Sequence, residues 1–180
     1  LATNTRPDIA HSTNMLARAS CNPVTQSMAV ACRIVMRYLI GTINTSIEYS
    51  PQSEKAFEKL YTDVSKHPDN EKVKVDQMKN PVTTFTDASF GVTFKEMRSI
   101  SGCIIYLYGT PIAWSSKVQS VFAKSTTESE WIAMSDGISL SESVFQVHQF
   151  LLGRPQQHGP LFCDNRGATL SARQADTTDI

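Results

Sequence analysis

The sequence lacks the features that mark several common protein classes. Its 17 Lys and Arg residues balance 17 Asp and Glu residues, so no net positive field marks it as a general polyanion binder. Its four cysteines form no Cys-x-x-Cys pair, which argues against a zinc knuckle or a redox motif. No apolar run approaches the roughly 18 to 20 residues of a membrane span, and the first residues do not form a signal peptide. We therefore expect free thiols, a reducing compartment and no membrane segment.

The chain is long enough for one good core, or for one core with a smaller helical module. It has 180 residues, of which 41% are hydrophobic. It begins without Met and ends at Ile180 without a helix stop, so we expect it to be a piece of a longer protein. Changes in composition predict three parts: a helical part over 1–50, a charged linker or insertion over 51–80, and an α/β domain over 81–180.

The first part has the pattern of two helices. In the second of them, Asn22 is a good N-cap, Pro23 suits the first helical position, and an apolar stripe ends at Gly41. We also expect a short strand over 43–49 and a short helix over 56–64.

The α/β domain has alternating strand and helix signals. Gly109 as the first central residue of a two-residue loop predicts a hairpin with a type II′ turn. Ser125 and Glu128 form a capping box, which predicts the start of a long helix. The expected elements are strands over 82–86, 103–108 and 111–115, a helix over 126–152, a strand over 160–164 and a helix over 165–172. Three antiparallel strands, a crossover helix, a parallel strand and a last helix make a mixed α/β sheet.

Three acidic residues converge in this topology. Asp87 and Asp164 each end a strand, and if these parallel strands are neighbours the two carboxylates lie side by side. Glu130 lies one turn inside the long helix, on the side of Met134 that must face the sheet. Glu128 is occupied with the capping box, so we choose Glu130 as the third acid. Any one acid at a strand end is more simply a turn former, but three together weaken that interpretation.

Three converging carboxylates repel one another unless a cation neutralises them. Hard oxygen ligands select Mg²⁺ or Mn²⁺ over softer metals. Two such ions about 4 Å apart can activate a water and stabilise the leaving oxygen of a phosphodiester. The expected chemistry is therefore phosphodiester hydrolysis, with Asp87, Glu130 and Asp164 as catalytic and metal-binding residues.

Five blocks of residues follow one another in an order that is typical of a known family. The blocks are Thr86-Asp87-Ala88-Ser89, Arg98-Ser99-Ile100-Ser101-Gly102, Ile112 to Gln119, Ser125 to Met134, and Cys163-Asp164-Asn165. Together with Arg6-Pro7-Asp8-Ile9 and the stretch from Arg33 to Thr42, they resemble the end of the reverse transcriptase and the ribonuclease H domain of copia-type LTR retrotransposon Pol polyproteins. The resemblance covers nearly the whole chain and implies a ribonuclease H-like fold preceded by a small helical module.

The resemblance implies an activity and partners. It places metal ligands at Asp87, Glu130 and Asp164, and the substrate is the RNA strand of an RNA/DNA hybrid, cut during reverse transcription. Ser89, Lys117 and Asn165 are candidates for contacts with the nucleic acid. The other partners are the polymerase palm and the integrase of the polyprotein. The location is cytoplasmic, in a virus-like particle, or nuclear.

The family pattern includes a fourth acid, which we expect beyond Ile180, since Asp176 and Asp179 fall too early. We therefore expect a domain truncated at its C-terminus, with weak or no activity. The polymerase's paired aspartates are absent from the sequence. An alternative is a catalytically inactive module that binds nucleic acid or acts as a scaffold. An integrase is disfavoured because its acids run Asp, Asp, Glu, and an ATPase of related fold because glycine-rich phosphate loops are lacking.

Overall fold

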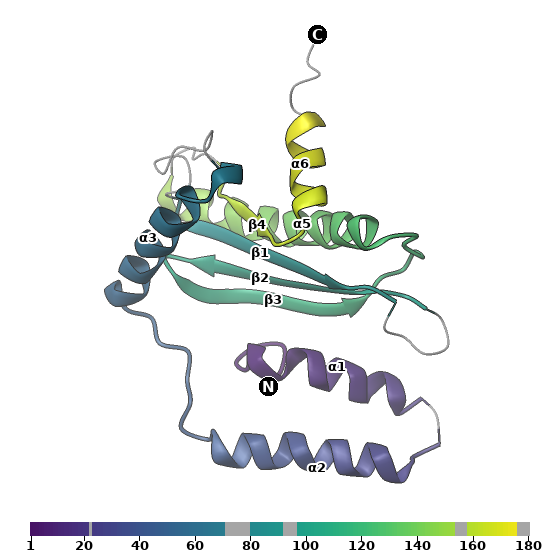
Figure 1. The fold of residues 1–180 in the computed structure, drawn as a ribbon. Coiled ribbons are helices and arrows are strands. Elements are labelled where there is room, and N and C mark those ends of the chain that lie inside the picture. Colours follow the sequence, from purple (N-terminus) through teal and green to yellow (C-terminus); the bar gives the residue numbers. More distant parts are fainter. Residues whose placement is uncertain (22, 71–79, 92–96, 154–157, 176–180) are drawn as a thin grey trace.

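The computed structural model describes residues 1–21, 23–70, 80–91, 97–153 and 158–175. Its centre is a four-stranded sheet in the order β3-β2-β1-β4 (Figure 1). The strands are β1 (Val82–Ser89), β2 (Ile100–Leu107), β3 (Thr110–Val118) and β4 (Leu161–Cys163). The first three are antiparallel neighbours, and β4 lies parallel to β1. The predicted fold class, a ribonuclease H-like mixed α/β sheet, is confirmed, and so is the predicted parallel direction of the first and last strands. The sequence left open whether these two strands are neighbours, and the structure shows that they are.

The β2–β3 hairpin differs from its predicted turn. Leu107 pairs with Thr110, so the two loop residues are Tyr108 and Gly109. Both have positive φ, 49° and 75°, which is the pattern of a type I′ turn and not of the type II′ turn predicted. The Tyr108 backbone nitrogen donates to the Pro81 carbonyl oxygen at 2.8 Å. The Tyr108 hydroxyl lies 3.1 Å from Nε2 of His148. These contacts place a tyrosine where the turn alone favours glycine or asparagine.

Helix α5 (Thr126–Leu152) covers one face of the sheet and contacts β1 and β2. Phe145 of this helix forms a buried core with Val82 of β1 and Ile105 of β2. The capping box is confirmed at its start, where the Ser125 hydroxyl accepts from the backbone nitrogen of Glu128 at 3.1 Å. The Glu128 carboxylate, expected to accept from Ser125, instead accepts from the backbone nitrogen of Lys124 at 2.6 Å. The helix ends at Leu152, as predicted, and Gly153 caps it with φ of 63°.

The opposite face carries helix α3 (Pro51–Ser65), which is longer than the helix predicted over 56–64. It packs through Phe57 and Tyr61 on aromatic rings of the sheet. Phe85 and Phe162 stack at 5.0 Å between neighbouring strands beneath it. A short 3-10 helix, η2 (Pro68–Asn70), follows. The division into parts at 50/51 and 80/81 stays a prediction, although α3 lies within the stretch predicted as a linker.

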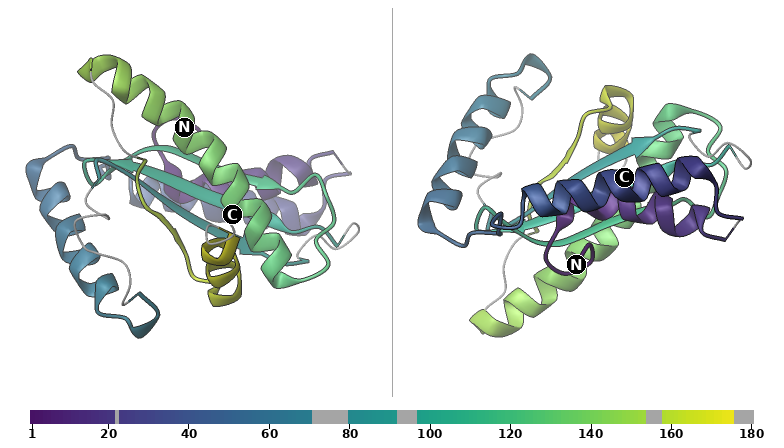
Figure 2. Two further views of the ribbon diagram at one scale, coloured as in Figure 1. Left: turned by 90° about the horizontal axis from the view of Figure 1, so that it is seen from above. Right: turned by 90° about the horizontal axis from the view of Figure 1, so that it is seen from below.

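Two helices at the start of the chain lie on the same side of the sheet as α3, away from α5 (Figure 2). After the 3-10 turn η1 (Pro7–Ile9), α1 (Ala10–Ala19) contacts β3, and α2 (Gln26–Gly41) packs on α1. The predicted start of α2 at Pro23 is wrong, because Thr25 is the N-cap and its hydroxyl accepts from the Met28 backbone nitrogen. The predicted cap Asn22 lies outside the described residues.

The strand predicted over 43–49 is also wrong: these residues have turn or irregular structure. The Thr110 hydroxyl of the sheet donates a hydrogen bond to the Glu48 carbonyl oxygen in this stretch, but the stretch does not pair with a strand through a backbone ladder. The last described element, α6 (Arg166–Ala175), follows β4 closely, as predicted for 165–172. Among the described residues, no helix is both long enough and apolar enough to cross a bilayer.

Candidate metal centre

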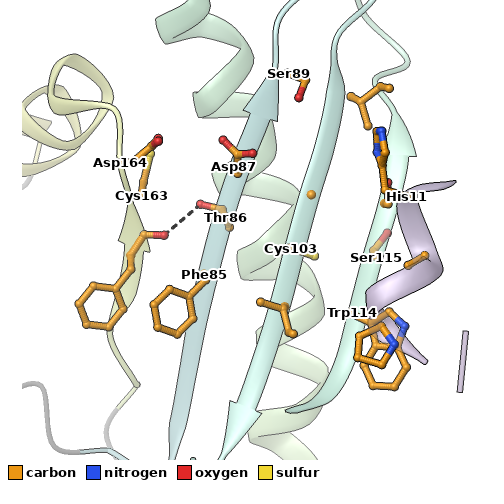
Figure 3. Close-up of a pocket in the computed structure, with 17 residues that line it drawn as sticks. His11, Phe85, Thr86, Asp87, Ser89, Cys103, Trp114, Ser115, Cys163 and Asp164 are labelled. Atoms are coloured by element: carbon orange, nitrogen blue, oxygen red, sulfur yellow. Dashed lines mark hydrogen bonds between the residues drawn. The ribbon is translucent and has the colours of Figure 1, made fainter. Parts of the chain in front are cut away.

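Asp87 and Asp164 lie next to each other at the carboxyl ends of two parallel strands. Thr86 pairs with Cys163 in the register of β1 and β4. Asp87 follows Thr86 and Asp164 follows Cys163, so the two acids are neighbours across the strands. Figure 3 shows both carboxylates at the end of the sheet, on the face away from α5. Both residues are exposed. The two acids therefore lie side by side, as expected if the two parallel strands are neighbours.

Glu130 reaches the same end of the sheet from α5. Its side chain is buried, with 5% of the residue exposed. Its Oε1 accepts a hydrogen bond from the Ala88 backbone nitrogen at 3.3 Å, and its Oε2 lies 3.6 Å from Sγ of Cys163, which donates to it. The helix can lie this close because Gly137, two turns later, faces the Thr86 methyl group, with no room between them for a Cβ atom.

The electrostatics of Glu130 follow from this position. Burial raises the pKa of its carboxyl, and the nearby charges of Asp87 and Asp164 raise it further. The hydrogen bonds from Ala88 and Cys163 act in the opposite direction, but the net pKa is raised. A cation among these acids would favour the charged form of all three.

The donor atoms are close enough for a shared ion. Glu130, Cys163 and Asp164 each offer one ligand atom, and these atoms lie within 4.8 Å of one another. Asp87 is outside that set and faces it from the neighbouring strand. Most of the donors are carboxylate oxygens, the type that Mg²⁺ and Mn²⁺ prefer, so the residues fit the predicted metals.

Sequence reasoning did not include Cys163 in this site. Its thiol is half-buried, and burial raises its pKa. Its place in the site follows from the pairing of two distant strands: Cys163 pairs with Thr86, which faces α5, so its side chain faces the helix that carries Glu130.

A groove of about 720 Å³ extends from the acids across the open face of the sheet. Asp87, Ser89 and Asp164 line one end of it, and Trp114 and His11 line the other (Figure 3). His11 belongs to α1, and its Nδ1 lies 3.3 Å from the Ser116 hydroxyl. The contribution of α1 depends on its docking against β3, for which the sequence carries no local signal.

The three predicted nucleic-acid contacts have different surroundings. Ser89 is exposed and lines the groove. Lys117 is exposed on β3 and forms an ion pair of 3.0 Å with Asp136. Asn165 caps α6, because its side-chain oxygen accepts from the Ala168 backbone nitrogen at 2.9 Å. Of the three, Ser89 has the position that a groove-bound strand would contact most directly.

Three curated relatives match nearly the whole chain. The retrovirus-related Pol polyproteins from transposons RE1 and RE2 of Arabidopsis thaliana are 29% and 30% identical to it, each over 92% of the chain. The retrovirus-related Pol polyprotein from transposon TNT 1-94 of Nicotiana tabacum is 26% identical over 91% of the chain. The chain corresponds to a segment of a retrotransposon Pol polyprotein.

This match confirms the family resemblance stated from the sequence blocks. The chain spans about 10% of the length of each of these Pol polyproteins, so other Pol regions are its neighbours in such a protein. No family model matches the chain, and the search of solved structures gave no significant match.

Proposed function

We propose that this Pol segment is a metal-dependent endonuclease that hydrolyses the RNA strand of RNA/DNA hybrids during retrotransposon reverse transcription. The observation that supports it most is the convergence of Asp87, Glu130 and Asp164 at one end of the sheet, beside an open groove. The polymerase palm and the integrase would be its partners in the polyprotein, in the cytoplasm within a virus-like particle, or in the nucleus.

The chain's own residues would perform separate tasks. Asp87 and Asp164 face the groove and would hold the ions where a phosphodiester can reach them. Glu130 is fixed by Ala88 and would hold an ion from the α5 side. When bound, two Mg²⁺ ions supply activation of a water and stabilisation of the leaving oxygen. The groove between these acids and Trp114 gives the nucleic acid a surface on the face that α5 does not cover.

Cleavage of a labelled RNA strand in an RNA/DNA hybrid tests this proposal. We expect at most weak Mg²⁺-dependent cleavage by the chain, because the fourth carboxylate is expected beyond Ile180, and the loss of any such cleavage in Asp87→Asn with an unchanged circular dichroism spectrum. Glu58→Gln on the exposed side of α3 is the matched control and should cleave as the unmodified chain does. Binding of Mn²⁺, followed by electron paramagnetic resonance, should weaken in Asp87→Asn as well.

Two results would count against an endonuclease. Cleavage by Asp87→Asn at the unmodified rate would remove Asp87 from the reaction. Hybrid binding with neither cleavage nor Mn²⁺ binding would favour the alternative, an inactive module that binds nucleic acid or acts as a scaffold.

A further inference from the structure

A second cleft opens on the other side of Asp164 from the groove. It has a volume of about 440 Å³ and lies between α6 on one side and the end of α3 with η2 on the other. Cys163 and Asp164 line both this cleft and the first groove. A ligand long enough to leave the groove past Asp164 would therefore enter the second cleft.

Two arginines and a histidine line the cleft, together with two acids, Asp63 and Asp164. Arg166 in the first turn of α6 and Arg173 two turns later both line it, and His67 faces them from the end of α3. One acid on the α3 side, Asp63, is already paired with Lys66 at 3.3 Å. The cleft thus places positive charge next to the acidic centre, although the chain as a whole has no net charge.

One of these arginines is held in place across the cleft. The Arg173 Nη2 donates to the side-chain oxygen of Asn70 at 2.7 Å. Asn70 is fixed in turn, since its side-chain nitrogen donates to the Val64 carbonyl oxygen at 3.1 Å and its backbone nitrogen to that of His67 at 2.8 Å. A guanidinium has five N–H donors in a planar fork, and the bond to Asn70 uses one of them.

We propose that the cleft between α3 and α6 binds a backbone phosphate of the nucleic-acid strand whose neighbouring phosphodiester lies at Asp87 and Asp164. This inference rests on the proposed function. A fork of N–H donors matches phosphate oxygens in geometry and charge. The acids repel a polyanion, and basic groups immediately beyond Asp164 would offset that repulsion and fix the strand's position.

Binding of an RNA/DNA hybrid by arginine variants tests the site. All proteins carry Asp87→Asn, so that cleavage does not interfere. We expect Arg166→Gln and Arg173→Gln each to weaken binding by about 3-fold to 10-fold, and to reduce the slope of log K against log salt by about 1. Arg173→Lys keeps the charge without the planar fork of donors, so its affinity for the hybrid should lie between that of Arg173→Gln and that of the parent. Arg33→Gln, on the exposed side of α2, is the control and should bind as the parent does.

Each outcome bears on the site separately from the endonuclease. Suppose that the chain with Asp87 intact cleaves hybrids, but that the Arg166 and Arg173 variants fold and bind hybrid with the affinity and salt slope of the Asp87→Asn parent. The phosphate site is then overturned and the endonuclease stands. If the arginine substitutions weaken binding but the chain with Asp87 intact never cleaves, the phosphate site stands and the endonuclease fails. If inorganic phosphate shifts the Arg173 resonances in NMR spectra but the variants bind hybrid normally, the cleft takes free phosphate and the strand assignment is wrong. Melting temperatures within a few degrees of the parent confirm that the variants fold.

Discussion

Oε1 of Glu130 accepts a hydrogen bond from the backbone nitrogen of Ala88 at 3.3 Å, which ties α5 to the strand that carries Asp87. The bond is made to the residue after Asp87, so it sets the distance between two of the three acids. A carboxylate that is fixed in this way does not need a metal ion to find its orientation.

Replacing Glu130 by Gln should separate catalysis from stability. The amide oxygen can still accept from Ala88, while the buried charge and its repulsion with Asp164 are lost. We expect cleavage and Mn²⁺ affinity to fall by at least about 100-fold, because loss of even an outer partner of a metal ligand costs about 10-fold to 100-fold. Urea unfolding in EDTA should show stability equal to or above that of the unmodified chain. A large drop in stability would mean that Glu130 has a structural role instead.

The stability of the metal-free protein should depend on pH through Glu130. Its pKa is raised in the folded state, so the folded state binds this proton more tightly than the unfolded chain does. The stabilising contribution is complete below the ordinary value of 4.5 and is lost as the pH rises through the raised pKa. Urea unfolding from about pH 4 to about pH 7 should show this decline.

Two comparisons isolate the contribution of Glu130 to that decline. Mg²⁺ binds only the ionised, folded site, so its addition should counteract the loss at the upper end of the range. Glu130→Gln should flatten the same part of the profile. A decline that persists unchanged in this variant would assign the effect to other groups.

Gly137→Ala tests whether the approach of α5 to β1 builds the site. A Cβ atom there would collide with the Thr86 methyl group, and the helix would have to move outward. We expect a loss of about 1 to 3 kcal/mol in unfolding free energy, as for overpacking of a well-packed core. The control is Gly41→Ala at the end of α2, where a Cβ atom meets nothing within 4 Å, so stability should stay equal or rise slightly.

The N-terminal segment should detach in acid. The Arg6 hydrogen bond lowers the pKa of Asp8 from 3.8 to about 2, and the same guanidinium bonds Thr42 at the end of α2. The contribution of this pair is present above pH 3.8 and is lost as the pH falls towards 2. Asp8→Asn should remove this pH dependence.

Fluorescence of Trp114 can follow that detachment, because its ring nitrogen donates to the Ala2 carbonyl oxygen at 2.6 Å. A Trp131→Phe background leaves it as the one tryptophan of the chain. Asp63→Asn, which removes an exposed ion pair with Lys66, is the control and should not alter the signal. An identical acid transition in Asp8→Asn would contradict the assignment.

The sequence predicted the parts of the fold that depend on local patterns. The capping box located the start of α5, and strand order with the crossover helix predicted that β4 runs parallel to β1. Asp87 and Asp164 come together because these two strands are also neighbours, which strand order alone left open. The same capping box separated Glu128 from Glu130 by giving Glu128 a local hydrogen bond.

The parts that the sequence did not predict depend on contacts between distant residues. Tyr108 adopts positive φ in a turn where His148 and Pro81 bind it, and neither partner is near it in the sequence. The stretch 43–49 has strand-forming residues but no backbone ladder to join. Cys163 became part of the site only through the facing of β4, which requires the register of a pairing between distant strands.

The pairing of β4 with β1 also has a consequence for the order of synthesis. A ribosome makes β1, the hairpin and α5 before the three residues of β4, so Asp87 and Glu130 can be in place while their third partner is still missing. The closure of a long loop must then precede the last step of assembly. A nascent polyprotein would thus carry an incomplete centre until Asp164 has left the ribosome. Under the proposed function, this order would delay cleavage of RNA until the segment has been translated and folded.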